Sequence, residues 1–373
     1  MSELVEWISV AILIYILLIA VSVIGTGFNT AAGNRARSLF EFAANPFAGL
    51  IIGTLATALI QSSTTVTSII VGLVAGGVPV STAIPMVMGA NIATTLTSTI
   101  VSLGHVRAGE EFRRAFAAAT IHDMYNVLSV AILFPLELIF HPLERITILI
   151  SQFMLDSKNI DMAAFDFMRA ITRPTARLIT SAFSNNLPEL FAGLAMIVIG
   201  ILMILFVVTY IGRLLRRLMV GKAKAILEKA IARGPIAGII AGAIITLLVQ
   251  SSTTTTSLIV PFAATGVFTL EQIYSLTLGA NVGTTVTAVL AATAISGEAG
   301  LFALQIALVH LTYNILSLLI VYGVPFLRNL PIWGARKLAE VALKQKLYVL
   351  AYVLGLYIII PGILLVASKA MGF

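Results

Sequence analysis

The chain has 373 residues, of which 59% are hydrophobic and only 10% are charged, and its mean hydropathy is +1.04. A soluble domain has about 25% charged residues, so this composition predicts an integral membrane protein. The net charge of +7 does not indicate a nucleic-acid partner, because membrane proteins gather Lys and Arg in cytoplasmic loops for reasons of topology.

The lack of cysteine excludes disulfides, thiol chemistry and cysteine-ligated metals. Four scattered histidines without a close carboxylate cluster give little support for zinc. We therefore expect no resident cofactor, and sodium ions enter the expectations below only as a transported species.

Seven apolar stretches have about the twenty residues needed to cross roughly 30 Å of hydrocarbon. The first begins with Glu3 and Glu6, where a signal peptide would have basic residues, and it is too long for one, so we expect it to stay in the mature protein. The predicted crossings are 4–24, 83–103, 115–134, 189–211, 272–295, 301–322 and 347–367.

An internal repeat organises the chain. The stretch PFAGLIIGTLATALIQSSTTVTSIIV (46–71) matches PIAGIIAGAIITLLVQSSTTTTSLIV (235–260) at 16 of 26 positions. Two further blocks follow in the same order, GANIATTLT (89–97) with GANVGTTVT (279–287) and HDMYNVLS (122–129) with HLTYNILS (310–317). We place repeat 1 at 40–134 and repeat 2 at 230–325.

The apolar segments on either side of each QSSTT run are too short to cross a bilayer alone. A re-entrant helical hairpin with QSSTT at its tip fits this pattern, over 46–76 and 235–266. Non-helical backbone at membrane depth is tolerated only where it is buried in protein or lines a cavity, so the tips are candidate binding sites.

Three predicted crossings separate the hairpins, and three is odd, so the hairpins enter from opposite faces. The positive-inside rule makes the side with most basic residues cytoplasmic. The segment 135–188 is then extracytoplasmic, although Arg35 and Arg37 also fall outside, against the rule. The cytoplasmic side collects 15 of the 23 basic residues: Arg107, Arg113, Arg114, Arg213, Arg216, Arg217, Lys222, Lys224, Lys229, Arg233, Arg328, Arg336, Lys337, Lys344 and Lys346.

The expected fold is an all-α integral membrane protein, a single transporter domain over 1–373 with two inverted-topology repeats. Each repeat has a re-entrant hairpin plus transmembrane helices, which is the architecture of secondary transporters. An amphipathic stretch at 327–346 precedes the last transmembrane helix at 347–367. It would either lie along the cytoplasmic interface, against membrane lipid, or form a contact in a homodimer.

The hairpin tips offer hydroxyls, amides and free N–H groups at helix starts, which suit an oxyanion. The alternative is that these Ser and Thr side chains only cap helices and join small-residue interfaces. The predicted substrate-binding residues are Gln61, Ser62, Ser63, Thr64, Gln250, Ser251, Ser252 and Thr253, with Asn91 and Asn281 from the GAN blocks.

Asp123 predicts a sodium site, because a carboxylate inside a membrane is costly and usually marks an ion path or has a partner. The competing interpretation is a salt bridge to Arg113 or Arg114. Asn126, one turn away, and further oxygen donors complete the predicted sodium ligands: Thr65, Thr94, Thr95, Thr254, Thr284, Thr285 and Asn314. For the GAN-block donors, helix packing is the alternative role.

His122 and His310 occupy equal positions in the two repeats, each four residues before an Asn. Proton coupling and a helix-to-helix hydrogen bond both fit this spacing. The acidic position beside them is not symmetric, since Leu311 stands where repeat 1 has Asp123.

Both QSST runs, the GAN blocks and EFRRAFAAATIHDMYNVLSV (111–130) resemble the type II sodium-phosphate (Na/Pi) cotransporter family over about residues 40–325. The resemblance implies transport of inorganic phosphate with sodium by alternating access, and it implicates the QSS residues of both runs in binding. Family members often have a third Ser where this chain has Thr64 and Thr253, which keep the hydroxyl. Without cysteine and with a short C-terminus, the chain looks like a minimal bacterial version, in the inner (plasma) membrane.

We therefore expect a sodium-coupled importer of phosphate. Another oxyanion such as sulfate or arsenate is the alternative substrate, and an anion channel filtered by hydroxyl rings is the rival from another class. A membrane enzyme is not expected, because the sequence has no hydrolase elbow or paired acidic motif.

Overall fold

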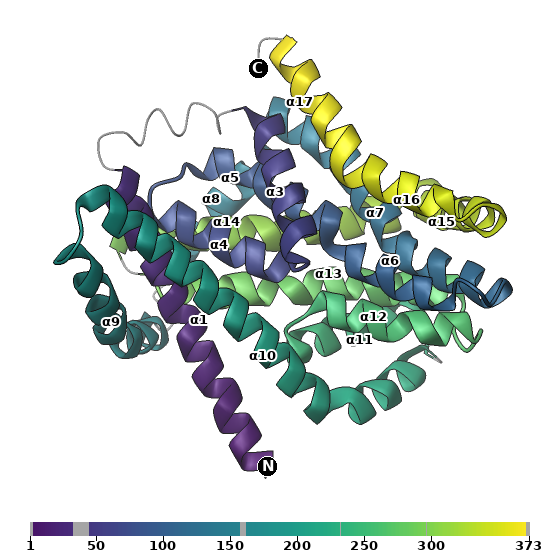
Figure 1. Ribbon diagram of the computed structural model, residues 1–373, viewed down its shortest axis with the longest axis horizontal. Helices are drawn as coiled ribbons and strands as arrows, with labels where there is room; N and C mark the ends of the chain where they lie inside the picture. The colour runs from purple at the N-terminus through teal and green to yellow at the C-terminus, as the bar shows by residue number, and fades with distance from the viewer. Residues whose placement is uncertain (1–2, 33–44, 157–161, 232, 296, 371–373) are drawn as a thin grey trace.

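The computed structural model describes residues 3–32, 45–156, 162–231, 233–295 and 297–370 (Figure 1). Every regular element in these ranges is a helix. The elements of the first half are α1 (Glu3–Ala32), α3 (Pro46–Ile60), α4 (Ser63–Ala75), α5 (Val80–Ile92), η2 (Ala93–Thr95), α6 (Leu96–Ser102), η3 (Leu103–His105), α7 (Glu110–Phe140), α8 (Pro142–Asp156) and α9 (Met162–Ser184).

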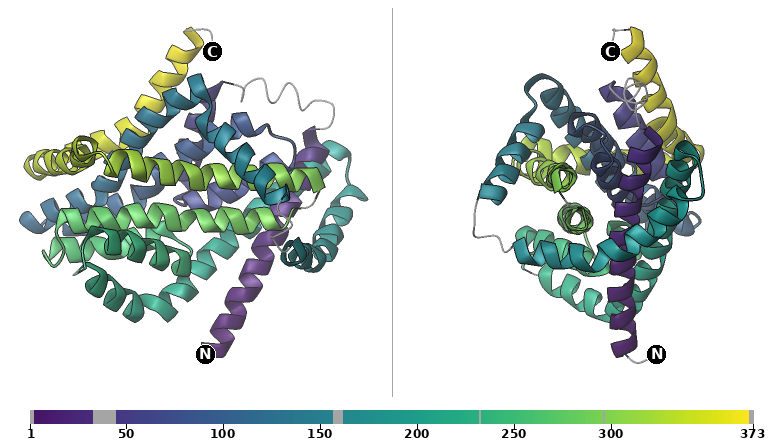
Figure 2. Two further views of the ribbon diagram at one scale, coloured as in Figure 1. Left: turned by 180° about the vertical axis from the view of Figure 1, so that it is seen from behind. Right: turned by 90° about the vertical axis from the view of Figure 1, so that its left-hand side faces the viewer.

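The elements of the second half are α10 (Glu189–Ile231), α11 (Pro235–Val249), α12 (Ser252–Ala264), α13 (Leu270–Thr293), α14 (Gly297–Ser317), η4 (Leu318–Tyr322), α15 (Pro325–Lys344), α16 (Leu347–Leu354), η5 (Gly355–Ile359) and α17 (Ile360–Ala370). Helices α13 and α14 lie side by side through the middle of the molecule (Figure 2). The two ends of the described chain lie at opposite edges (Figure 1).

Seven spans in the described ranges are long and apolar enough to cross a membrane, and each overlaps a crossing predicted from the sequence. Their bounds are Val5–Ala31, Val80–His105, Glu110–Phe140, Glu189–Ile211, Leu270–Thr293, Ala299–Tyr322 and Leu347–Ser368. The lengths and compositions of these helices confirm the prediction of seven candidate crossings.

Two pairs of short helices carry the repeated QSSTT motif. Helices α3 and α11 have 15 residues each, and α4 and α12 have 13 each. At about 1.5 Å per residue such a helix is roughly 20 Å long, shorter than the hydrocarbon layer. The helix breaks fall at Gln61–Ser62 and Gln250–Ser251, where the sequence predicted the tips.

Glycines bring the first helix of each pair against the next crossing. A Cβ on Gly53 of α3 would collide with the carbonyl oxygen of Met86 in α5, and a Cβ on Gly89 would collide with that of Leu50. In the second half, Gly242 and Gly279 produce the same close approach between α11 and α13. Small residues allow such backbone contact between membrane helices, and here they fix the tips relative to the crossings.

The two halves interlock. Helix α4 of the first half packs on α13 and α14 of the second, and α12 of the second half packs on α6, η2 and α7 of the first. The second helix of each short pair therefore lies against crossings of the other half, so polar residues from both repeats meet in the interior.

Several segments differ in detail from the expectation. The segment 135–188 contains the end of α7 and two further helices, α8 and α9. Helix α10 runs 43 residues, well beyond the crossing predicted at 189–211. The amphipathic stretch at 327–346 forms α15, whose buried Ala335, Ala339 and Ala342 contribute to clusters with α7 residues. Arg35, Arg37 and the start of repeat 1 at 40 lie outside the described residues.

Candidate functional site

Each QSST run forms a helix break with the same backbone shape. Gln61 ends α3 with φ +57° and Gln250 ends α11 with φ +55°, both left-handed. A non-glycine residue rarely adopts this conformation, and such residues cluster at functional sites. The equal geometry at equivalent positions of the two repeats shows that the motif encodes the break.

A serine caps the helix that follows each break. The Ser62 hydroxyl accepts hydrogen bonds from Thr65 N at 3.2 Å and from the Thr65 hydroxyl at 2.9 Å. The Ser251 hydroxyl accepts one from Thr254 N at 3.1 Å. Both serines are partly exposed, whereas the next serine of each run, at helix position one, is buried. The first N–H groups of a helix have no intrahelical partner, so each tip presents donors beside the capping hydroxyl.

The tip glutamines are held by threonines of the crossings. The Thr97 hydroxyl donates to Gln61 Oε1 at 3.3 Å, and the equivalent Thr287 donates to Gln250 Oε1 at 2.6 Å. Gln250 also donates from Nε2 to the Leu247 carbonyl at 2.7 Å. Neither threonine was predicted as a site residue, although TLT and TVT recur at the ends of the GAN blocks.

Contacts between hydroxyls join the two repeats. The hydroxyls of Ser98 in α6 and Thr256 in α12 lie 2.9 Å apart. The Thr253 hydroxyl donates to the Thr94 carbonyl at 3.5 Å. Thr94 belongs to η2, a 3₁₀ turn that interrupts the crossing Val80–His105, whereas the equivalent α13 of the second repeat is continuous. A 3₁₀ turn inside a helix often marks a hinge, and this one contacts the opposite QSST run.

The buried carboxylate of Asp123 accepts two phenol hydrogen bonds from the end of the chain. Tyr352 donates to Oδ2 at 2.8 Å and Tyr357 donates to Oδ1 at 2.9 Å. Side chains five residues apart on an α-helix point about 140° away from each other. The π turn η5 (Gly355–Ile359) widens the helix and lets both rings reach one carboxylate.

The predicted alternative partners of Asp123 lie elsewhere. Arg113 pairs with Glu110 at 2.8 Å, and Arg114 Nε donates to the Ala264 carbonyl at 2.8 Å. Among the described residues, no lysine, arginine or histidine forms an ion pair with Asp123. The two tyrosines were not predicted, although a phenol in an apolar crossing usually needs a hydrogen-bond partner.

A buried amide network surrounds the GAN asparagines. His122 Nε2 lies 2.5 Å from Asn281 Oδ1, and Asn281 Nδ2 donates to Asn126 Oδ1 at 2.8 Å. Asn126 Nδ2 in turn donates to the Asn91 carbonyl at 2.7 Å. For His122 the helix-to-helix hydrogen bond is therefore present. Asn126 and Asp123, two of the predicted sodium ligands on α7, have different hydrogen-bond partners in the structure.

The second repeat does not reproduce this network. Both ring nitrogens of His310 and the Oδ1 atom of Asn314 are buried without a hydrogen-bond partner. The Thr284 hydroxyl is likewise unpaired, whereas the hydroxyls of Thr94 and Thr285 donate to backbone carbonyls four and three residues earlier. Thr95, Thr64, Ser63, Ser252 and Thr254 are buried.

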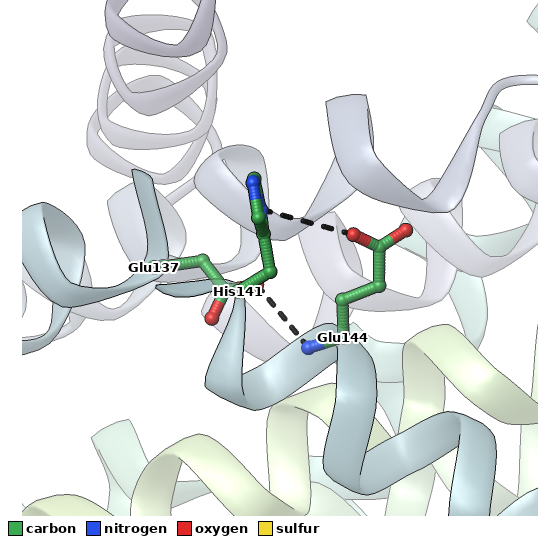
Figure 3. Close-up of side chains that lie close together, drawn as sticks. All are labelled: Glu137, His141 and Glu144. Atoms are coloured by element: carbon green, nitrogen blue, oxygen red, sulfur yellow. Dashed lines mark hydrogen bonds and ion pairs between the residues drawn. The ribbon is translucent and has the colours of Figure 1, made fainter. Parts of the chain in front are cut away.

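The expectation that no histidine has carboxylates close by is wrong at His141. Its ring, Glu137 and Glu144 place ligand atoms within 4.8 Å of one another, at the junction of α7 and α8 (Figure 3). Glu137 accepts hydrogen bonds from Leu143 N at 2.7 Å and Glu144 N at 3.2 Å. The buried Glu137 carboxylate thereby caps the start of α8, which accounts for its position.

These features define a class: a multi-pass helical membrane protein with two matching helix breaks, a buried polar interior and an intramembrane carboxylate, the elements of a secondary transporter. The sequence model of a family described as Na+/Pi-cotransporter matches residues 16–204 and 202–327, in two segments. The chain therefore belongs to the Na+/Pi cotransporter family, a family of transporters and not of enzymes.

Relatives agree with this assignment. The chain is 32% identical over 435 residues to sodium-dependent phosphate transport protein 2B of Homo sapiens, covering 93% of this chain and 63% of that protein. It is 33% identical over 432 residues to protein 2A of Ovis aries, covering 96% and 67%. The chain thus spans less than two thirds of the length of the 2B relative. No solved structure matches the chain.

Proposed function

We propose that this chain is a sodium-coupled secondary active transporter that imports inorganic phosphate across the plasma membrane by alternating access. The observation that carries the proposal is the pair of equivalent QSST helix breaks, each with a left-handed glutamine and a serine-capped helix start. Family membership and relatives named sodium-dependent phosphate transport proteins support phosphate and sodium as the transported species.

Phosphate would bind at the two tips. The starts of α4 and α12 provide partial positive charge and N–H donors, which favour an anion without a fixed cation. The Gln, Ser and Thr side chains of both runs, 61–64 and 250–253, would add hydrogen bonds, and Asn91 and Asn281 are the further proposed contributors. A site without Arg or Lys releases a multivalent anion more readily, and co-bound sodium supplies the missing charge.

Sodium would bind at oxygen donors around Asp123. Its carboxylate is buried without a cationic partner among the described residues and is balanced only by phenol donors. An uncompensated charge in this position is costly, and a sodium ion would neutralise it. Asn126, Asn314 and the threonines of both repeats (Thr65, Thr94, Thr95, Thr254, Thr284 and Thr285) are the further proposed ligands.

Alternating access would arise from the interlocked repeats. The short pairs α3–α4 and α11–α12 are proposed re-entrant hairpins that enter from opposite faces, with the Lys- and Arg-rich side cytoplasmic. Because α4 and α12 each pack on crossings of the other half, a shift of one half relative to the other would open the tips to one face and then to the other.

Uptake into proteoliposomes tests the proposal. Radiolabelled phosphate is measured under an inward sodium gradient and an equal potassium gradient, for the unchanged protein and for Ser62→Ala with Ser251→Ala. We expect sodium-dependent, saturable uptake that the double substitution abolishes. Uptake of sulfate or arsenate but not phosphate would show that the proposed substrate is wrong. Non-saturable flux independent of sodium would identify a channel.

A further inference from the structure

Three arginines surround a cavity that the transport site does not use. The cavity has a volume of about 350 Å³ and is lined by Arg113 and Arg114 of α7 and Arg336 of α15, together with residues around the turn from α12 to α13. The start of α7, this turn and α15 lie at the same end of the molecule (Figure 1). The positive-inside rule makes this end cytoplasmic.

The charge of the lining is positive. No Asp or Glu is among the described residues that line the cavity. Arg113 and Arg336 each have an exposed glutamate partner, Glu110 at 2.8 Å and Glu271 at 2.5 Å. Exposed ion pairs are weak, so these partners only partly offset the arginines.

Of the three arginines, Arg114 is the one whose guanidinium has no carboxylate partner among the described residues. Its Nε donates to the Ala264 carbonyl, which fixes the side chain at the cavity. The described residues place no carboxylate within ion-pair distance of it, and its remaining N–H groups are free to bind an anion. A guanidinium anchored through Nε keeps a planar edge that matches two phosphate oxygens.

The start of α13 adds to the positive electrostatic potential in the cavity. Thr269 and Leu270 line the cavity, and α13 is a 24-residue helix that begins at Leu270. The positive end of its dipole therefore faces the same space as the arginines. The end of α12 also lies here, but the arginine that binds its last carbonyl already offsets the negative end of that helix.

We infer that this cavity is a cytoplasmic binding site for a phosphate-bearing anion, held by Arg114 and Arg336 with support from Arg113. Two sources share that chemistry: free inorganic phosphate, and the headgroup of an anionic lipid reached through α15, which is amphipathic and follows a crossing. The site is separate from the QSST tips and stands independently of the proposed transport.

Binding to the purified full chain in neutral detergent and sodium-free potassium buffer tests the inference. Calorimetric titration with inorganic phosphate forms one arm, and native mass spectrometry with phosphatidylglycerol against phosphatidylcholine forms the other. The variant Arg114→Gln with Arg336→Gln is expected to lose about tenfold or more in affinity for whichever anion binds. Arg328→Gln, on the same helix but outside the lining, is the matched control and keeps the affinity.

Glu271→Gln is expected to change the anion affinity in the opposite direction, which a folding defect would not do. It removes the partner of Arg336 and is expected to strengthen anion binding several-fold. Phosphate binding lost in the double variant assigns the site to free phosphate, and phosphatidylglycerol binding alone assigns it to lipid. Equal binding of both anions by the double variant and the unchanged chain overturns the inference. Because no sodium gradient is used, a failure of transport would leave this result unaffected.

Discussion

Tyr357 of the seventh crossing donates a hydrogen bond to Asp123, in the middle of the third crossing, at 2.9 Å and across 234 residues of chain. With Tyr352 it satisfies both oxygens of a carboxylate that has no counter-ion among the described residues. The segment that supplies them lies beyond residue 327, where the match to the family ends. If sodium binds Asp123, it must share or replace these bonds.

Tyr357→Phe is therefore expected to increase sodium affinity. Without this phenol, the Asp123 carboxylate has one hydrogen-bond donor fewer in the sodium-free state. That state is destabilised more than the sodium-bound state, so sodium binding becomes more favourable. A hydrogen bond to a charged group contributes about 1.5–3 kcal/mol, which predicts at least a tenfold fall in the sodium concentration for half-maximal phosphate uptake. Tyr348→Phe, on the exposed face of α16, is the control. An unchanged sodium dependence in Tyr357→Phe would remove Asp123 from the sodium site.

The serine caps allow substrate binding to be separated from helix stability. Ser62→Ala removes the cap of α4 and is expected to lower its stability by about 1 kcal/mol, whereas Asn caps a helix as well as Ser does. Ser62→Asn should therefore keep the thermal unfolding temperature in detergent and yet lose phosphate uptake, because its larger amide fills the space of the hydroxyl at the tip. Normal uptake by Ser62→Asn would show that Ser62 is only a cap.

Thr287 and Thr97 form a matched pair for testing the tip glutamines. Thr287→Val keeps the shape but removes the 2.6 Å bond that orients Gln250. We expect the phosphate concentration for half-maximal uptake to rise about fivefold to tenfold, in line with about 1 kcal/mol for a lost hydrogen bond. Thr97→Val removes a longer bond of 3.3 Å and should have a smaller effect. The reverse order, or no effect of either change, would contradict a role for Gln250 in binding.

The parts of the structure that follow from local sequence were predictable. Hydrophobic length predicts the seven crossings, and the repeated motif predicts both helix breaks, because each depends on residues close together in the chain. The partner of Asp123 was not predictable in this way, since it depends on a π turn that rotates two tyrosines toward a residue more than 200 positions away. The carboxylates around His141 could have been predicted from the sequence, because Glu137 and Glu144 lie within four residues of it.

The asymmetry between the repeats also could not be predicted from local sequence, because it depends on tertiary packing. His122 and His310 have equal sequence positions, yet only His122 has a hydrogen-bonded ring. Motif matching treats the repeats as equivalent, whereas side-chain partners depend on how α7 and α14 pack in the folded chain.

Gly279→Ala tests the close approach that positions the second tip. An added methyl group would collide with the Ile239 carbonyl and with Ala243 N, both backbone atoms that cannot move aside without shifting α11. Overpacking of this kind typically costs about 1–3 kcal/mol, so we expect a clear fall in the thermal unfolding temperature and loss of sodium-dependent uptake. At Gly104 a Cβ would meet no atom within 4 Å, and Gly104→Ala should leave both properties unchanged. If Gly279→Ala unfolded and transported like the unchanged protein, the contact between α11 and α13 would not determine the position of the Gln250 tip.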